Sequence, residues 1–148
     1  MSLWGWALEA YAQEGVPAAA LTLQDAYGQN TSYLLWAVWA EGPSPDALRQ
    51  AVQTAKAWDA AVLKPIREVR RTLKTPLPPV DDEARQGLRE DVKAAELRAE
   101  RVLIETLETL AGPAGGGMPA LEALKAASAA WGEPAPDDAL AALAAVLS

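Results

Sequence analysis

The fold is decided by residues 44–113, SPDALRQAVQTAKAWDAAVLKPIREVRRTLKTPLPPVDDEARQGLREDVKAAELRAERVLIETLETLAGP. Ser44, Pro45 and Asp46 combine an N-cap, a first-turn proline and an acid near the positive end of the helix dipole. Beyond them, mainly apolar side chains recur at alternating steps of four and three, the spacing of one helix face. They are Leu48, Val52, Ala55, Asp59, Val62, Ile66, Val69 and Leu73. The pattern predicts a long helix over residues 45–74.

A second long helix is predicted over residues 82–111, after a proline-rich connector at 75–80 that cannot be helical. Its repeating face comprises Leu88, Val92, Ala95, Ala99, Val102, Thr106 and Leu110. Pro65 lies inside the first helix and removes a backbone hydrogen bond, so we expect a bend near Ala61 without a break. Similar lengths and a short connector predict an antiparallel helical hairpin.

The remaining segments predict shorter helices on both sides of the hairpin. Caps, glycines and prolines place three apolar helices at about 3–14, 17–27 and 31–41, and two alanine-rich helices at about 119–130 and 137–147. The expected class is all-α, with the three N-terminal helices packed on the hairpin. We expect residues 1–111 to form the core domain and 112–148 a Gly/Pro linker and helical appendage, whose docking the sequence leaves open.

Composition excludes most familiar catalytic chemistry. The 148 residues include no His and no Cys, which removes the commonest metal ligand, the usual general base and thiolate chemistry. We therefore expect a non-enzymatic protein without a cofactor or metal. Glu96 and Glu100 have a spacing found in di-metal bundles, but those sites also use His. The net charge of −7 disfavours general DNA binding, and no signal peptide or membrane span is evident, so we expect a cytoplasmic protein.

A basic stripe is the first candidate site. Spacings of three and four residues relate Arg67, Arg70, Arg71 and Lys74, which places them near one helix face. Such a stripe could clamp phosphate or carboxylate groups. The alternative, which we favour, is pairing with acids on the antiparallel neighbour. The acids expected there are Asp82, Glu83, Glu90 and Asp91.

A polar cluster is the second candidate. Gln24, Asp25 and Asn30 lie close together between two apolar helices and could bind a small polar ligand. The structural alternative is helix capping, which is routine for Asp and Asn. Asp59 is the polar member of the apolar face, and we expect an Arg or an indole to satisfy it. The six Trp residues are expected to be core pieces and not a stacking platform.

Three segments together resemble a known family: LWGWALEAYAQEGVPAAALTLQDAYGQNTSYLLWAVWA (3–40), WDAAVLKPIREVRRTLK (58–74) and ELRAERVLIETLETLA (96–111). The family comprises small bacterial proteins known only as a domain of unknown function. Its pattern usually has Cys, Asp and Asn where this chain has Ala20, Asn30 and Ser32. The resemblance covers about residues 3–111 and implies a helical cytoplasmic protein with no assigned activity.

Three functional hypotheses follow from these residues. The leading one is a protein–protein interaction module, self-associating or bound to another protein, because the short helices are unusually apolar. The second is a module that binds a nucleotide or RNA phosphate through the basic stripe, with affinity that falls steeply with salt. The third is an enzyme that uses Asp25 or Asp59.

Overall fold

The chain is an all-helical bundle built on one long hairpin. The computed structural model describes residues 2–110 and 117–147, and those residues include no strand, so the predicted all-α class is confirmed. The elements are α1 (Leu3–Ala12), α2 (Val16–Tyr27), α3 (Thr31–Trp39), α4 (Pro45–Trp58), η1 (Asp59–Leu63), α5 (Lys64–Thr72), α6 (Asp82–Leu110), α7 (Ala120–Trp131) and α8 (Asp137–Leu147).

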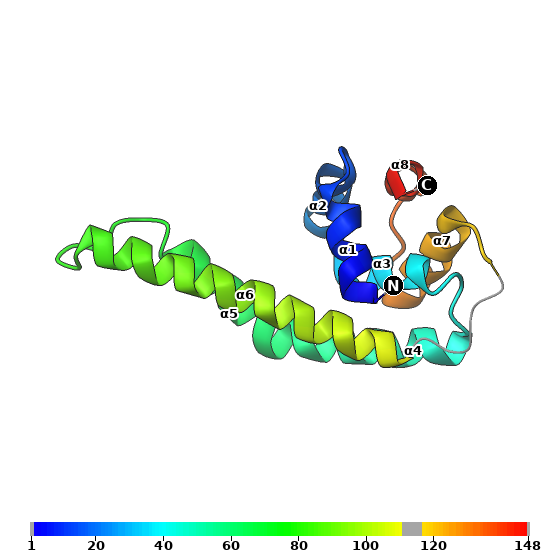
Figure 1. Ribbon diagram of the computed structural model, residues 1–148, viewed down its shortest axis with the longest axis horizontal. Helices are drawn as coiled ribbons and strands as arrows, with labels where there is room; N and C mark the ends of the chain where they lie inside the picture. The colour runs from blue at the N-terminus through cyan, green and yellow to red at the C-terminus, as the bar shows by residue number, and fades with distance from the viewer. Residues whose placement is uncertain (1, 111–116, 148) are drawn as a thin grey trace.

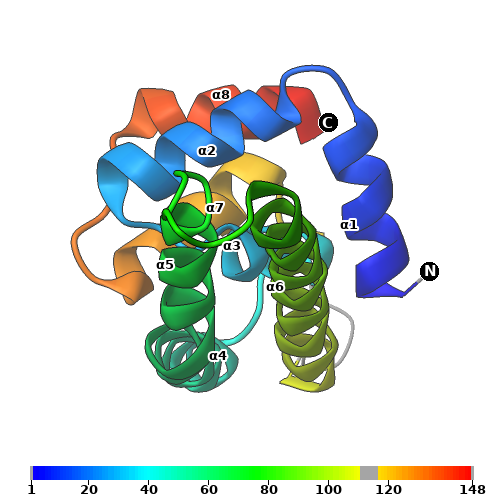
Figure 2. The ribbon, with the colours of Figure 1, turned by 90° about the vertical axis from the view of Figure 1, so that its left-hand side faces the viewer.

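The hairpin consists of α4, η1 and α5 on one side and α6 on the other, as Figures 1 and 2 show. Its first arm stays helical across Pro65, because the chain forms a wider π-helical turn just before it. In that turn the Lys64 N–H donates to the Asp59 carbonyl, five residues back. A π turn rearranges the backbone hydrogen bonds around a position that a proline disrupts. The π-helical turn η1 thus contains Ala61, the residue near which the sequence predicted a bend.

The buried face of α6 differs from the predicted one. Leu103, Ile104 and Leu107 are at most 3% exposed, whereas Val102 and Thr106 of the predicted face are exposed. The predicted face followed from the spacing of apolar residues within α6 alone. In the structure α6 also packs on α1 and α3, so its buried face is rotated toward them.

The short helices all lie on one side of the hairpin (Figures 1 and 2). Their caps are local: Ser2 Oγ accepts from Gly5 N at 3.1 Å, and α2 ends at Gly28, whose φ of +64° suits glycine. α1 is tied to the hairpin where Leu3 N donates to Glu108 Oε1 at 2.8 Å. Trp36 of α3 is fully buried at the centre of the core.

The C-terminal helices α7 and α8 dock on the N-terminal ones, which the sequence left open. Leu124 and Leu143 are fully buried in the common hydrophobic core, and α7 packs on α3 while α8 packs on α2. The Tyr33 hydroxyl donates to the Ala127 carbonyl at 2.8 Å and joins α3 to α7. The expected Gly/Pro linker lies outside the described residues, except for Gly117.

The tryptophans behave as core pieces, as expected. Beside the buried Trp36, the other five are partly exposed and pack against the core cluster. Trp58 Nε1 donates to the Ala99 carbonyl at 2.9 Å and joins α4 to α6.

Among residues 2–110 and 117–147, no helix combines the length and apolarity that crossing a membrane requires.

Candidate binding cleft

A cleft of about 850 Å³ lies between the short N-terminal helices and the hairpin. α1, α2 and the start of α3 form one wall, and η1, α5 and α6 form the other. The first wall depends on the tight turn at Gly15, whose φ of +90° lets the chain reverse from α1 into α2. A volume of this order accommodates a drug-sized ligand or a short peptide segment.

Four large apolar side chains of this cleft are partly exposed. Leu8 and Tyr11 of α1, Leu21 of α2 and Leu97 of α6 are between 39% and 56% exposed. They come from both walls, so an occupant would touch them together. Burial of apolar surface contributes roughly 25 cal/mol per Å², which makes such a lined cleft a favourable place for an apolar group.

The Arg67 guanidinium forms the charged centre of the hairpin wall. It faces three carboxylates: Nη1 lies 3.3 Å from Asp59 Oδ1, Nε 3.4 Å from Glu96 Oε1 and Nη2 3.5 Å from Glu100 Oε1. The planar fork of an arginine carries five N–H donors, so it can serve several carboxylates at once. No group of His, Cys, Asp and Glu in the two described ranges is arranged to hold a metal ion.

Two further cations complete this cluster. Arg70 Nη1 donates to Glu96 Oε1 at 2.7 Å, and Lys64 Nζ lies 3.6 Å from Asp59 Oδ2. The pairing with α6 that we favoured is therefore present for Arg67 and Arg70, but not with the expected acids, namely Asp82, Glu83, Glu90 and Asp91. The acids that they contact, Glu96 and Glu100, lie further from the connector than the expected ones.

Burial changes the acidity of two groups in the cleft. Burial is the largest cause that raises the pKa of Glu100, with Glu96 adding to it, while Arg67 opposes the shift. Burial likewise raises the pKa of Tyr11 to about 12, assisted by the negative charge of Glu100. Both shifts disfavour negative charge here, so the Glu100 carboxylate would gain from a further hydrogen-bond donor or cation.

A polar corner closes one end of the cleft, where α2 meets α3. Thr31 Oγ1 donates to Gln24 Oε1 at 3.4 Å. Gln29 is 3% exposed, and its Nε2 donates to the Glu133 carbonyl at 3.2 Å. Its Oε1 is buried without a hydrogen-bond partner among the described residues. A buried acceptor left unpaired is costly, so this oxygen also favours an occupant that brings a donor.

A family model described as "Protein of unknown function (DUF2390)" matches residues 2–107. The chain belongs to this family. The match confirms the resemblance that the sequence indicated over about residues 3–111. It spans α1 to α5 and most of α6, hence both walls of the cleft, and it stops before α7 and α8. No curated protein and no solved structure matches the chain.

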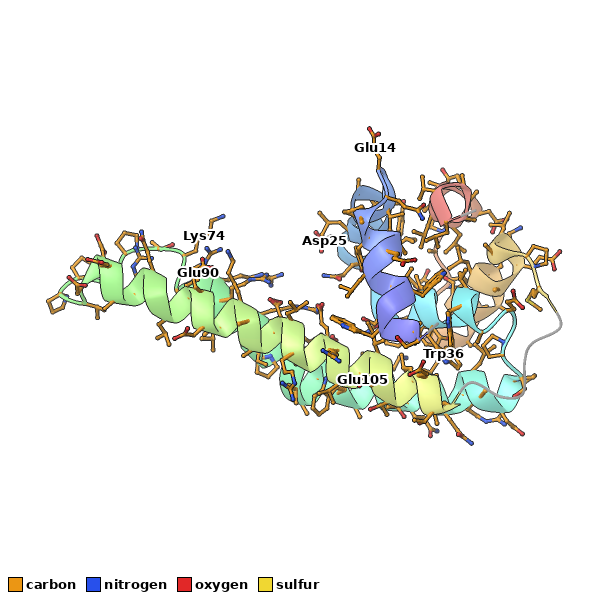
Figure 3. All side chains as sticks on the ribbon, in the orientation of Figure 1. Glu14, Asp25, Trp36, Lys74, Glu90 and Glu105 are labelled. Atoms are coloured by element: carbon orange, nitrogen blue, oxygen red, sulfur yellow. The ribbon has the colours of Figure 1, made fainter. Side chains whose placement is uncertain are left out.

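The DUF2390 region of this chain brings only half of the predicted site residues to the cleft. Those that line it are Gln24, Asn30, Asp59 and Arg67; those that do not are Asp25, Arg70, Arg71 and Lys74. Figure 3 shows Asp25 on α2 and Lys74 near the far end of the hairpin, well apart. Asn30 caps α3, because its Oδ1 accepts from Tyr33 N at 2.9 Å. Asp59 is satisfied by Arg67, as we expected.

Most residues that line the cleft were not predicted as site residues, and Tyr11, Glu100, Gln29 and Leu97 are among them. The sequence placed Tyr11 on an apolar helix face and Gln29 and Leu97 in no site. It considered Glu100 only for its spacing from Glu96, which resembles that of metal ligands in di-metal bundles. The sequence signal for Glu100 was its one-turn spacing from Glu96 opposite a basic helix. Tyr11, Gln29 and Leu97 carry no local signal, because they meet the cleft only through the packing of helices that are distant in sequence.

Proposed function

We propose that this protein is a non-enzymatic protein–protein interaction module whose cleft binds an amphipathic segment of a partner protein. The observation that carries the proposal is the set of four partly exposed apolar side chains on opposite walls of one cleft. Grooves of this kind in helical proteins receive the apolar face of a partner helix or peptide. That the protein acts in the cytoplasm stays a prediction.

The polar groups of the cleft define the chemistry of the partner. Gln29 Oε1 is an unpaired buried acceptor, and Glu100 is held by Arg67 at 3.5 Å while its pKa is raised. Both groups favour a hydrogen-bond donor or a positive charge. The matching segment therefore carries apolar side chains on one face and a Lys or Arg among them, because that residue type supplies both.

The alternative of an anionic ligand on the basic stripe has less support. Arg67 and Arg70 already face carboxylates of the hairpin, so a phosphate would have to displace ion pairs that are partly buried. Arg71 and Lys74 are exposed and have no ion pair among residues 2–110 and 117–147. Two exposed cations bind a phosphate weakly, with an affinity that salt would readily reduce.

Site-specific photo-crosslinking in the native cell tests the proposal. A photoreactive amino acid is placed at Leu21 in the cleft and, as a matched control, at Leu77 in the connector, which is similarly exposed. We expect a protein crosslinked from position 21 and absent from position 77. The crosslinked peptide, identified by mass spectrometry, should carry several apolar residues and a Lys or Arg.

Three outcomes would overturn the proposal. They are no crosslink at position 21 beyond that at position 77, a crosslinked species that is not a peptide, and a crosslinked peptide without a basic residue. Once the peptide is known, Glu100→Gln should weaken its binding by about tenfold, the effect of removing one charged partner. Unchanged affinity in that variant would remove Glu100 from the site.

A further inference from the structure

The side of the hairpin that faces away from the short helices carries a second apolar surface. In Figure 1 the short helices lie over one side of the C-terminal part of α6, and no described element covers the opposite side of α6 in Figures 1 and 2. Leu88 and Val102 of α6 are 51% and 39% exposed on that side, and Ala95 lies midway between them and is also exposed. Steps of seven residues keep these three side chains on one stripe of the helix.

A shallow apolar groove of about 390 Å³ widens this stripe toward the other arm of the hairpin. Val102 and Thr106 of α6 line it from one side, and Ala57, Trp58 and Ala61 of α4 and η1 from the other. The stripe between Leu88 and Val102 is about 21 Å long by the rise per residue of a helix. Both arms of the hairpin therefore contribute to one uncovered face.

The order of residues along the stripe suits a second copy of the chain as its occupant. Leu88 and Val102 each lie seven residues from Ala95. If two α6 helices cross antiparallel about a two-fold axis at Ala95, each Leu88 meets the Val102 of the other copy, and the two Ala95 methyl groups meet each other. A two-fold interface requires such a surface, in which residue i contacts j and j contacts i. The small side chain of Ala95 allows the helices to approach closely at the axis.

The charges beside the stripe have the same symmetry. Asp91 and Arg98 lie one heptad apart on one flank of the stripe, and they are placed about equally on either side of the proposed axis. Antiparallel crossing brings each Asp91 opposite the Arg98 of the other copy. Both side chains are exposed, and neither has a hydrogen bond or ion pair among the described residues. They are thus free to form two symmetric ion pairs.

We propose that the chain forms a two-fold symmetric dimer through the outer face of the hairpin, with α6 antiparallel to α6 of the second copy and Ala95 at the axis. The two hairpins then pack as a four-helix arrangement. The dimer leaves the cleft accessible, because the cleft lies on the other side of α6. This proposal does not depend on the proposed function, and the two can fail separately.

Sedimentation equilibrium of the full chain tests the dimer. We expect the unmodified chain to be dimeric at concentrations of about 10 to 100 μM, the range in which a modest interface is occupied. Ala95→Glu should weaken dimerisation about 100-fold, since each dimer would bury two opposed carboxylates. Ala94→Glu is the matched control, because Ala94 is also exposed but lies about 100° around the helix from Ala95. It should leave the dissociation constant within about threefold.

A charge exchange tests the register. Asp91→Arg or Arg98→Asp alone should weaken the dimer about tenfold through repulsion, and the double exchange should restore it. Circular dichroism verifies that each variant keeps its helicity. A monomeric chain, a dimer that tolerates Ala95→Glu as well as Ala94→Glu, or a double exchange that fails to restore association would each overturn the proposal. Leu21→Glu in the cleft should leave the dimer unchanged.

Discussion

Replacement of Arg67 by Ala should destabilise the protein substantially, because one side chain serves three carboxylates. The side chains of Arg67, Asp59 and Glu96 are 16%, 16% and 9% exposed. Removing one partner of a buried ion pair typically costs about 3 to 5 kcal/mol, since the other charge is left uncompensated. Here Lys64 still pairs with Asp59 and Arg70 with Glu96, which reduces the expected loss to about 2 to 3 kcal/mol.

Urea denaturation measures this loss. With a slope of about 2 kcal/mol per molar urea for a domain of this size, the midpoint should fall by about 1 to 1.5 M. Arg71→Ala is the control, because Arg71 lies on the same helix, is exposed and has no ion pair among the described residues; it should change stability by less than about 0.5 kcal/mol. Arg67→Lys should fall between the two. Equal midpoints for Arg67→Ala and Arg71→Ala would refute the reasoning.

Three further predictions concern stability and its pH dependence. Because the pKa of Glu100 is raised in the folded protein, the contribution of Glu100 to stability is most favourable in acid and is lost as the pH rises through that pKa. Glu100→Gln should therefore raise the melting temperature at pH 7 relative to the unmodified chain, and it should have no such benefit at pH 4. Equal changes of the melting temperature at the two pH values would contradict a raised pKa of Glu100. Leu107→Ala should lower the free energy of unfolding by about 2 to 5 kcal/mol, and Thr106→Ala should lower it by less than about 1 kcal/mol. If chemical denaturation showed the reverse order, it would support the face of α6 that the sequence predicted. Asn30→Ala should cost about 1 to 2 kcal/mol in the same assay, and no loss would show that its cap is dispensable.

The positions of the main helices could be read from the chain because their signals are local. Ser44 and Asn30 cap helices where their side chains predict it, and Gly28 ends α2 with a left-handed backbone. These interactions join residues three or four positions apart, so no tertiary contact is needed to form them. The π turn before Pro65 was only partly foreseen, because a proline signals a disturbance without determining its form.

The candidate cleft could be predicted only in part. Asp59 was predicted as a candidate because it is polar on an apolar helix face, and Arg67 because it belongs to the basic stripe. Leu97 and Tyr11 did not, because a leucine or tyrosine on a helix is ordinary until its neighbours are known. The partners of Arg67 were also placed wrongly, since long side chains on adjacent helices can reach acids one or more turns away from the nearest backbone position.

The sequence by itself determined the helical class, the two long helices and their proline-rich connector, because hydrophobic period and capping act over a few residues. Only the tertiary structure decided which face of α6 is buried, that α7 and α8 join the core, and that a cleft remains between the short N-terminal helices and the hairpin. Those features depend on how helices remote in the chain share their apolar surfaces, and a single helix cannot specify its neighbours.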